Sequence, residues 1–223
     1  MSRLGDALAA RLSFLAVRNT LYKAVYDARK PRKATNDLTY REKGVIAAGA
    51  GAVGALVSNA FETRMVRRIG DVGRPERFVR ADVSHGQLSA GLGAHVLRAA
   101  LLNGLLTWCY DQMNIRMRTT FGDSFINAPG ALLVTAALAT VVVLPVDNIK
   151  TRLQYAYADP ALNRLAYGNK GLVAAAKAFQ YEGGYTYFAG AYPFYIRMFI
   201  YSLSTVYVSN MLERRARRNS RSK

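Results

Sequence analysis

Apolar or amphipathic stretches alternate with polar segments along the 223-residue chain. Five of these stretches approach the length of a membrane span, for which a helix needs roughly 20 residues. Small residues recur within them and allow helices to approach closely in lipid. We therefore predict an all-α membrane protein with five transmembrane helices. The stretches cover residues 4–27, 43–66, 90–113, 128–153 and 189–212.

Two longer polar segments, residues 67–89 and 155–182, separate the second stretch from the third and the fourth from the fifth. Within the latter segment, the apolar positions of residues 171–179 recur at helical spacing. This amphipathic pattern predicts a short helix lying along the membrane surface.

The charge of the chain is strongly positive, with a formal net charge of +17. Such a charge is typical of nucleic-acid binders, but no stacking-aromatic or basic-helix module accompanies it. Lys and Arg instead crowd the segments between the apolar stretches and the tail at residues 214–223. We therefore expect membrane lipids as partners, including bound cardiolipin or another anionic lipid, and no nucleic acid.

Catalytic and metal chemistry find little support in the sequence. The chain has one cysteine and two histidines, which excludes an internal disulfide and argues against a zinc site. Ser, His and Asp show no nucleophile-base spacing, and no P-loop or dinucleotide fingerprint occurs. We expect no enzyme activity, metal or cofactor.

The fourth apolar stretch closes with the pattern P-x-D-x-x-K-x-R-x-Q, from Pro145 to Gln154. Proline kinks a helix, and charges at this depth in a membrane need partners. Asp147 and Lys150, three residues apart, share one helical face and can pair within the helix or with a neighbour. The pattern resembles the signature of the mitochondrial carrier family, in which three repeats build a salt-bridged gate on the matrix side.

The resemblance extends to the other repeats. Residues 182–190 resemble the family's E-G-x-x-x-x-aromatic-x-G loop, and residues 26–30 its cytoplasmic [FY]-[DE]-x-x-[KR] motif at the end of the second helix. The chain then lacks the family's first helix and keeps helices two to six. A competing interpretation makes residues 1–26 an arginine-rich targeting segment. The implied units are a remnant of the first repeat at residues 1–40, the second repeat at 41–120, the third at 121–215 and a basic tail at 216–223.

Within the family, the chain is most similar to the 2-oxoglutarate/malate carriers, through residues 50–57, 98–103 and 190–197. That similarity implies that Arg98 and Arg197 bind substrate carboxylates, since guanidinium groups hold carboxylates bidentately. Arg18 matches a further arginine of the second helix. The main contact position on that helix is Ala10 here, with Arg11 one residue out of register.

Both gates of the family are incomplete in this sequence. Met65 and Asn114 stand where bases are expected, and Asn210 stands where an acid is expected. On the matrix side, Arg64 is a candidate substitute for the base missing at Met65. The matrix gate remnant comprises Glu62, Arg64, Asp147, Lys150 and Gln154, and the cytoplasmic remnant comprises Tyr26, Asp27, Lys30, Tyr110 and Asp111.

Incomplete gates bear on function, because alternating access requires two closed states that are each stabilised. Five helices would also leave Arg98 and Arg197 open to lipid on one side of the barrel, where charge is costly. We therefore predict a multi-pass protein of the mitochondrial inner membrane that is transport-incompetent and serves as a structural, supernumerary subunit. Its partners would be subunits of a respiratory-chain or ATP synthase assembly that cover the side of the missing first helix. The alternative is a functional antiporter of 2-oxoglutarate, malate or related carboxylates.

Overall fold

The computed structural model describes most of the chain as helix, and no strand occurs in the described part. The described residues are 3–29, 38–70, 91–122, 127–156, 176–177, 180–181, 183–204 and 207. Their elements are α1 (Arg3–Arg29), α2 (Tyr40–Gly70), α3 (Leu92–Phe121), α4 (Asn127–Ala156), the 3-10 helix η4 (Gly184–Phe188) and a helix at residues 191–204, called the C-terminal helix below.

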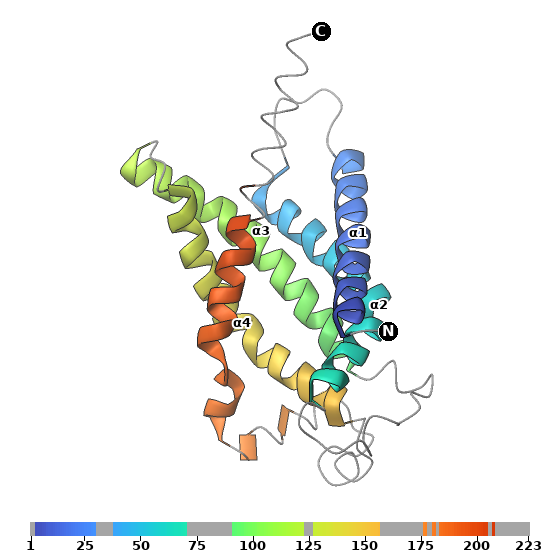
Figure 1. Ribbon diagram of the computed structural model, residues 1–223. Coiled ribbons are helices and arrows are strands. Elements are labelled where there is room, and N and C mark those ends of the chain that lie inside the picture. Colours follow the sequence, from blue (N-terminus) through green and yellow to red (C-terminus); the bar gives the residue numbers. More distant parts are fainter. Residues whose placement is uncertain are drawn as a thin grey trace.

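The long helices form one bundle in which successive helices run in opposite directions (Figure 1). α2 packs against α1 and α3, and α3 packs against α4. The C-terminal helix lies beside α3 and α4, where Phe194 and Met198 join a buried cluster with Val143 and Leu144. The all-α prediction is therefore confirmed, although α3 continues beyond residue 113 to Phe121.

Glycines allow the first three helices to approach closely. A Cβ atom built on Gly51 of α2 would lie 2.6 Å from the Asn103 side chain and 2.8 Å from the Ala99 carbonyl oxygen of α3. One built on Gly54 would lie 3.2 Å from Phe14 of α1. Close contact at small residues is the usual mode of helix association in lipid.

The bundle exposes large apolar side chains and buries several polar ones, beside a buried apolar cluster. Apolar side chains on outward faces are exposed, including Leu12 at 64% and Val45 at 70%. Lys150 and Gln154 are the two largest of the fully buried side chains. Lysine is almost never fully buried in soluble domains unless it is paired, and intramembrane charges typically face the interior of a bundle.

Two segments, Tyr40–Val66 and Asn127–Gln154, are long and apolar enough to cross a membrane. They correspond to the second and fourth predicted spans, and the other three spans stay predictions. Pro145 lies inside α4, and the helix changes direction between its two halves (Figure 1), as proline causes.

Some predicted features fall largely outside the described residues. Of the predicted surface helix at residues 171–179, only residues 176–177 are described, and both are helical. The boundaries of the four predicted units stay predictions.

Candidate functional site

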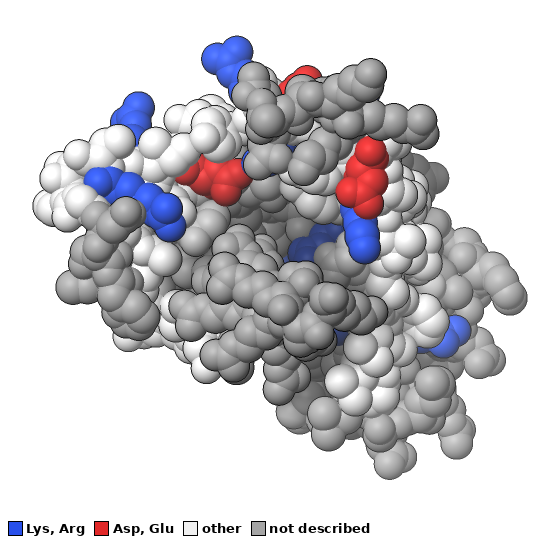
Figure 2. Space-filling model, turned by 90° about the horizontal axis from the view of Figure 1, so that it is seen from above, with Lys and Arg blue, Asp and Glu red and all other residues white. Residues whose placement is uncertain are grey.

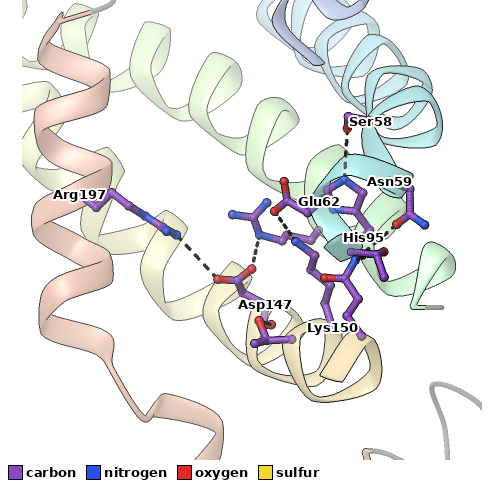
Figure 3. Close-up of polar contacts among 11 residues, drawn as sticks. Ser58, Asn59, Glu62, His95, Asp147, Lys150 and Arg197 are labelled. Carbon is purple, nitrogen blue, oxygen red and sulfur yellow. Dashed lines mark hydrogen bonds and ion pairs between the residues drawn. The ribbon is translucent and has the colours of Figure 1, made fainter. Parts of the chain in front are cut away.

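A network of polar side chains, most of them buried or partly buried, joins α2, α3, α4 and the C-terminal helix (Figure 3). On α4 its members are three, four and seven residues apart, and on α2 each member has another three or four residues away, so each set lies on one side of its helix. The polar network, as we call it, contains Ser58, Asn59, Glu62 and Thr63 of α2, His95 and Arg98 of α3, Asp147, Lys150 and Gln154 of α4, and Arg197 of the C-terminal helix.

The ion pair between Lys150 and Glu62 joins α4 to α2. The Lys150 Nζ atom donates to Glu62 Oε1 over 2.6 Å, and the lysine side chain is 2% exposed. The sequence left open whether Asp147 and Lys150 pair within their own helix or with a neighbouring one. In the described structure both pair with other helices. Lys150 binds Glu62 of α2, whereas Asp147 binds α3 and the C-terminal helix.

Asp147 brings together the two arginines that the sequence predicts as carboxylate ligands. Its Oδ1 atom forms an ion pair with Arg98 Nε, and its Oδ2 atom lies 3.8 Å from Arg197 Nη2 (Figure 3). The Arg197 guanidinium also lies 5.0 Å from the ring centroid of Phe194, a favourable cation–π distance. One carboxylate of the chain itself therefore occupies the position where two guanidinium groups converge.

Gln154 extends the network toward the end of α4. Its Nε2 atom donates to Asn59 Oδ1 over 3.4 Å and to Thr63 Oγ1 over 3.3 Å. Gly91, which precedes α3 with a φ of 67°, lies against this side chain, and a Cβ there would be 3.0 Å from Gln154 Cγ. Gln154 of α4 therefore contacts both α2 and the start of α3.

Sequence reasoning missed four members of the network, namely Ser58, Asn59, Thr63 and His95. The three residues of α2 are polar interruptions of the second apolar stretch, and their spacing was the available signal. The fourth member, His95, has its Nε2 atom 3.4 Å from Ser58 Oγ.

Arg64 forms no ion pair with another described residue, so the structure gives no support to its role as a substitute base.

The C-terminal helix is held in place by Asn148, the residue next to Asp147. Its Nδ2 atom donates to the carbonyl oxygens of Tyr187 over 2.8 Å and Ala189 over 3.1 Å. Gly190 then adopts a φ of 78°, which allows the chain to turn into the helix that carries Arg197. Of the predicted loop at residues 182–190, Glu182 lies outside the described residues.

A cavity of about 500 Å³ lies among the helices, lined by residues from α1, α2, α3, α4 and the C-terminal helix. A smaller cavity of about 60 Å³ is lined by members of the polar network together with Arg11. The two cavities share four lining residues and are therefore adjacent. Seen from above, the described surface is hollowed in its middle, with basic side chains inside the hollow (Figure 2). The shared residues are Arg18, Asn103, Leu106 and Tyr201.

Arg18, the third predicted carboxylate ligand, is held by neutral groups. Its Nη1 atom donates to Asn103 Oδ1 over 3.0 Å and to the Tyr201 hydroxyl over 3.4 Å. Its Nε and Nη2 atoms donate to Asn19 Oδ1 over 3.0 and 2.7 Å. Arg18 thus forms no ion pair with Asp147 in the described structure, which does not place the three arginines on one common carboxylate.

The predicted cytoplasmic gate is only partly assembled among the described residues. Tyr110 and Asp111 line the larger cavity together with Tyr22, and the Tyr26 ring stacks on Tyr22 at 5.9 Å. Asp27 is exposed. Lys30 lies outside the described residues, so its predicted pairing stays a prediction.

Residues 123–220 match the family model described as "Mitochondrial carrier protein". The match includes α4 and the C-terminal helix, which carry Asp147, Lys150 and Arg197. No curated protein matches the chain. The family match and the apolar helices together support a carrier-like membrane protein, and members of this family are transporters rather than enzymes.

Proposed function

We propose that this protein is a multi-pass subunit of a mitochondrial inner-membrane assembly, built on a carrier scaffold that no longer exchanges solutes. In this proposal five helices cross the membrane, and the scaffold is related to the 2-oxoglutarate/malate carriers. The observation that carries it is the bridging of Arg98 and Arg197 by Asp147. The assembly would be a respiratory-chain complex or ATP synthase.

The bridge favours a structural role because Asp147 occupies the position that a transported carboxylate would need and offsets one of the two arginine charges there. Removing one partner from a buried ion pair costs about 3–5 kcal/mol. A substrate carboxylate that displaced Asp147 would therefore have to supply a similar interaction energy with the two arginines. Of the ion pairs expected on the matrix side, the described residues supply the one between Glu62 and Lys150. Met65 and Asn114 offer no charge where the carrier pattern has bases.

The surface of the bundle supports embedding among other membrane components. Large apolar side chains such as Val57 and Val141 are more than half exposed, and the Arg197 side chain is 48% exposed. A cation in hydrocarbon requires a partner. We propose that neighbouring subunits cover this side of the bundle, and that cardiolipin or another anionic lipid neutralises part of the +17 charge.

Purification of the tagged protein from its native mitochondria in a mild detergent tests this role. We expect stoichiometric co-migration with one large assembly on native gels, and loss of that assembly when the protein is depleted. Recovery of the protein as an isolated species, with every respiratory complex and ATP synthase intact after depletion, would contradict the proposal.

The second candidate function is exchange of 2-oxoglutarate, malate or related carboxylates. It is favoured by the same convergence of Arg98 and Arg197, because Asp147 would then hold the place of a substrate carboxylate. In proteoliposomes, exchange that is lost in Arg98→Ala and kept in Arg64→Ala would establish this function and overturn the structural one. Arg64 is a suitable control because it lies outside both cavities.

A further inference from the structure

The larger cavity contains two charged side chains, Arg18 and Asp111, among its described lining residues. Among the described residues, Arg18 donates its hydrogen bonds to neutral oxygens, those of Asn19, Asn103 and Tyr201. Its charge is therefore oriented but has no carboxylate partner in the described structure. A guanidinium held in this way is ready to receive an anionic group without a large ordering cost.

Asp111 is only partly exposed. It forms no hydrogen bond or ion pair with any residue that the structure describes. Lys43 of α2 acts on it electrostatically without forming an ion pair. A carboxylate in such surroundings favours a cationic partner, because desolvation without a partner is costly.

The two charges lie at different levels of the cavity. Arg18 Nη1 binds Asn103, and Asn103 and Asp111 are eight positions apart on α3, which corresponds to about 12 Å along a helix axis. The wall between these levels includes Leu106, Thr107 and Tyr110. The cavity thus has a cationic end and an anionic end, separated by a wall of apolar and hydroxyl-bearing side chains.

We propose that this cavity binds an elongated zwitterion, with its anionic group on Arg18 and its ammonium group on Asp111. The volume of about 500 Å³ lies in the usual range for small-molecule pockets. A dianion of the same length would bring a second negative charge against Asp111, and a dication would bring a positive charge against Arg18. The charge pair therefore selects against both.

This inference goes beyond the proposed function and does not depend on membership of an assembly. It concerns a site apart from the arginines that Asp147 bridges, and a bound zwitterion is compatible with a structural subunit. A failure of ligand binding would leave the co-purification test unaffected, and the converse also holds.

Binding to the full-length protein in nanodiscs, measured by calorimetry, tests the charge requirement. The probes are 6-aminohexanoate, hexanoate, hexylamine, adipate and 1,6-diaminohexane, which share a length but differ in their end groups. We expect 6-aminohexanoate to bind about tenfold or more tightly than each of the others, since each lacks or reverses one charge-assisted contact. Equal or tighter binding of adipate would overturn the proposal.

The distance between the charges gives a second test. In the series 4-aminobutanoate, 6-aminohexanoate and 8-aminooctanoate, we expect affinity to rise with length, because the shortest member cannot reach both ends. Tightest binding of 4-aminobutanoate would overturn the elongated geometry.

Two variants assign each end of the ligand. In Asp111→Asn we expect 6-aminohexanoate and hexanoate to bind alike, and in Arg18→Gln we expect 6-aminohexanoate and hexylamine to bind alike. Misfolding would abolish binding of all probes rather than equalise one chosen pair. Lys23→Gln, which removes an exposed cation from the helix that carries Arg18, is the matched control and should preserve the preference. Preference for 6-aminohexanoate over hexanoate in Asp111→Asn would overturn the assignment.

The same charge pair fits a zwitterionic lipid headgroup as well as a soluble molecule. Competition experiments distinguish these sources, with nanodiscs that contain or lack phosphatidylethanolamine. Weaker 6-aminohexanoate binding in the presence of this lipid supports a headgroup at the site, and unchanged binding supports a soluble zwitterion.

Discussion

The Lys150 ammonium donates to the Glu62 carboxylate over 2.6 Å, although the two residues are 88 positions apart in the chain. The pair connects α4 to α2 across the interior of the bundle, where both side chains are largely removed from solvent. Its partners are interdependent, since each would be a buried, unpaired charge without the other.

We expect Glu62→Gln to lower the free energy of unfolding by about 3–5 kcal/mol, because it leaves the Lys150 charge without its carboxylate. The double variant Glu62→Gln/Lys150→Met should recover part of this loss. Thermal unfolding in nanodiscs, with Asp27→Asn as the exposed control, measures both effects. A Glu62→Gln protein as stable as the parent would show that the pair contributes little.

Asp147→Ala should leave Arg98 and Arg197 facing each other without an intervening carboxylate. We expect a loss of about 3–5 kcal/mol of stability, and we expect added acetate to restore part of it by occupying the vacated position. The readout is the difference in melting temperature with and without acetate, compared between this variant and the parent. Equal acetate effects in the two proteins would argue against convergence of the arginines on one anion site.

Two glycines of α2 provide a matched test of helix packing. Gly51→Ala should destabilise the fold by about 1–3 kcal/mol, because its Cβ would lie 2.8 Å from the backbone oxygen of Ala99, which cannot move aside freely. Gly49 has no atom within 4 Å of the corresponding Cβ position. Gly49→Ala should therefore be neutral or stabilising by up to about 1 kcal/mol, through helix propensity. Reversed effects in unfolding measurements would contradict this packing of α2 on α3.

Asn148→Ala should release the turn before the C-terminal helix, since it removes the donor to the Tyr187 and Ala189 carbonyl oxygens. We expect a loss of about 1–3 kcal/mol and faster amide hydrogen exchange across residues 184–190. Thr151→Ala is the control, because the Thr151 hydroxyl binds the Asp147 carbonyl oxygen of its own helix. Similar exchange rates in the two variants would refute the anchoring role of Asn148.

The helical architecture was largely accessible from the sequence, because apolar periodicity and the Pro145-to-Gln154 pattern report local structure and membrane depth. The same pattern placed Asp147, Lys150 and Gln154 at membrane depth, where charged side chains need partners. It could not identify their partners. Spacing on one helix brings Asp147 and Lys150 to one face, but the closer opposite charges on α2, α3 and the C-terminal helix depend on how those helices rotate and cross.

The contribution of His95 was equally inaccessible. A single histidine in an apolar stretch has no local signature that separates a paired side chain from one that faces lipid. Arg18 illustrates the opposite case, since the resemblance marked it as a ligand of carboxylates, whereas its neutral contacts with Asn19 and Asn103 follow from tertiary packing.

Asn148 couples the turn before the C-terminal helix to α4. The Asn148 amide binds two carbonyl oxygens of this turn. A rotation of α4 about its axis at Asn148 therefore also displaces the start of the C-terminal helix. Asp147 on α4 and Arg197 on the C-terminal helix would then move together, so the distance between their charges would change less than if the two helices moved independently.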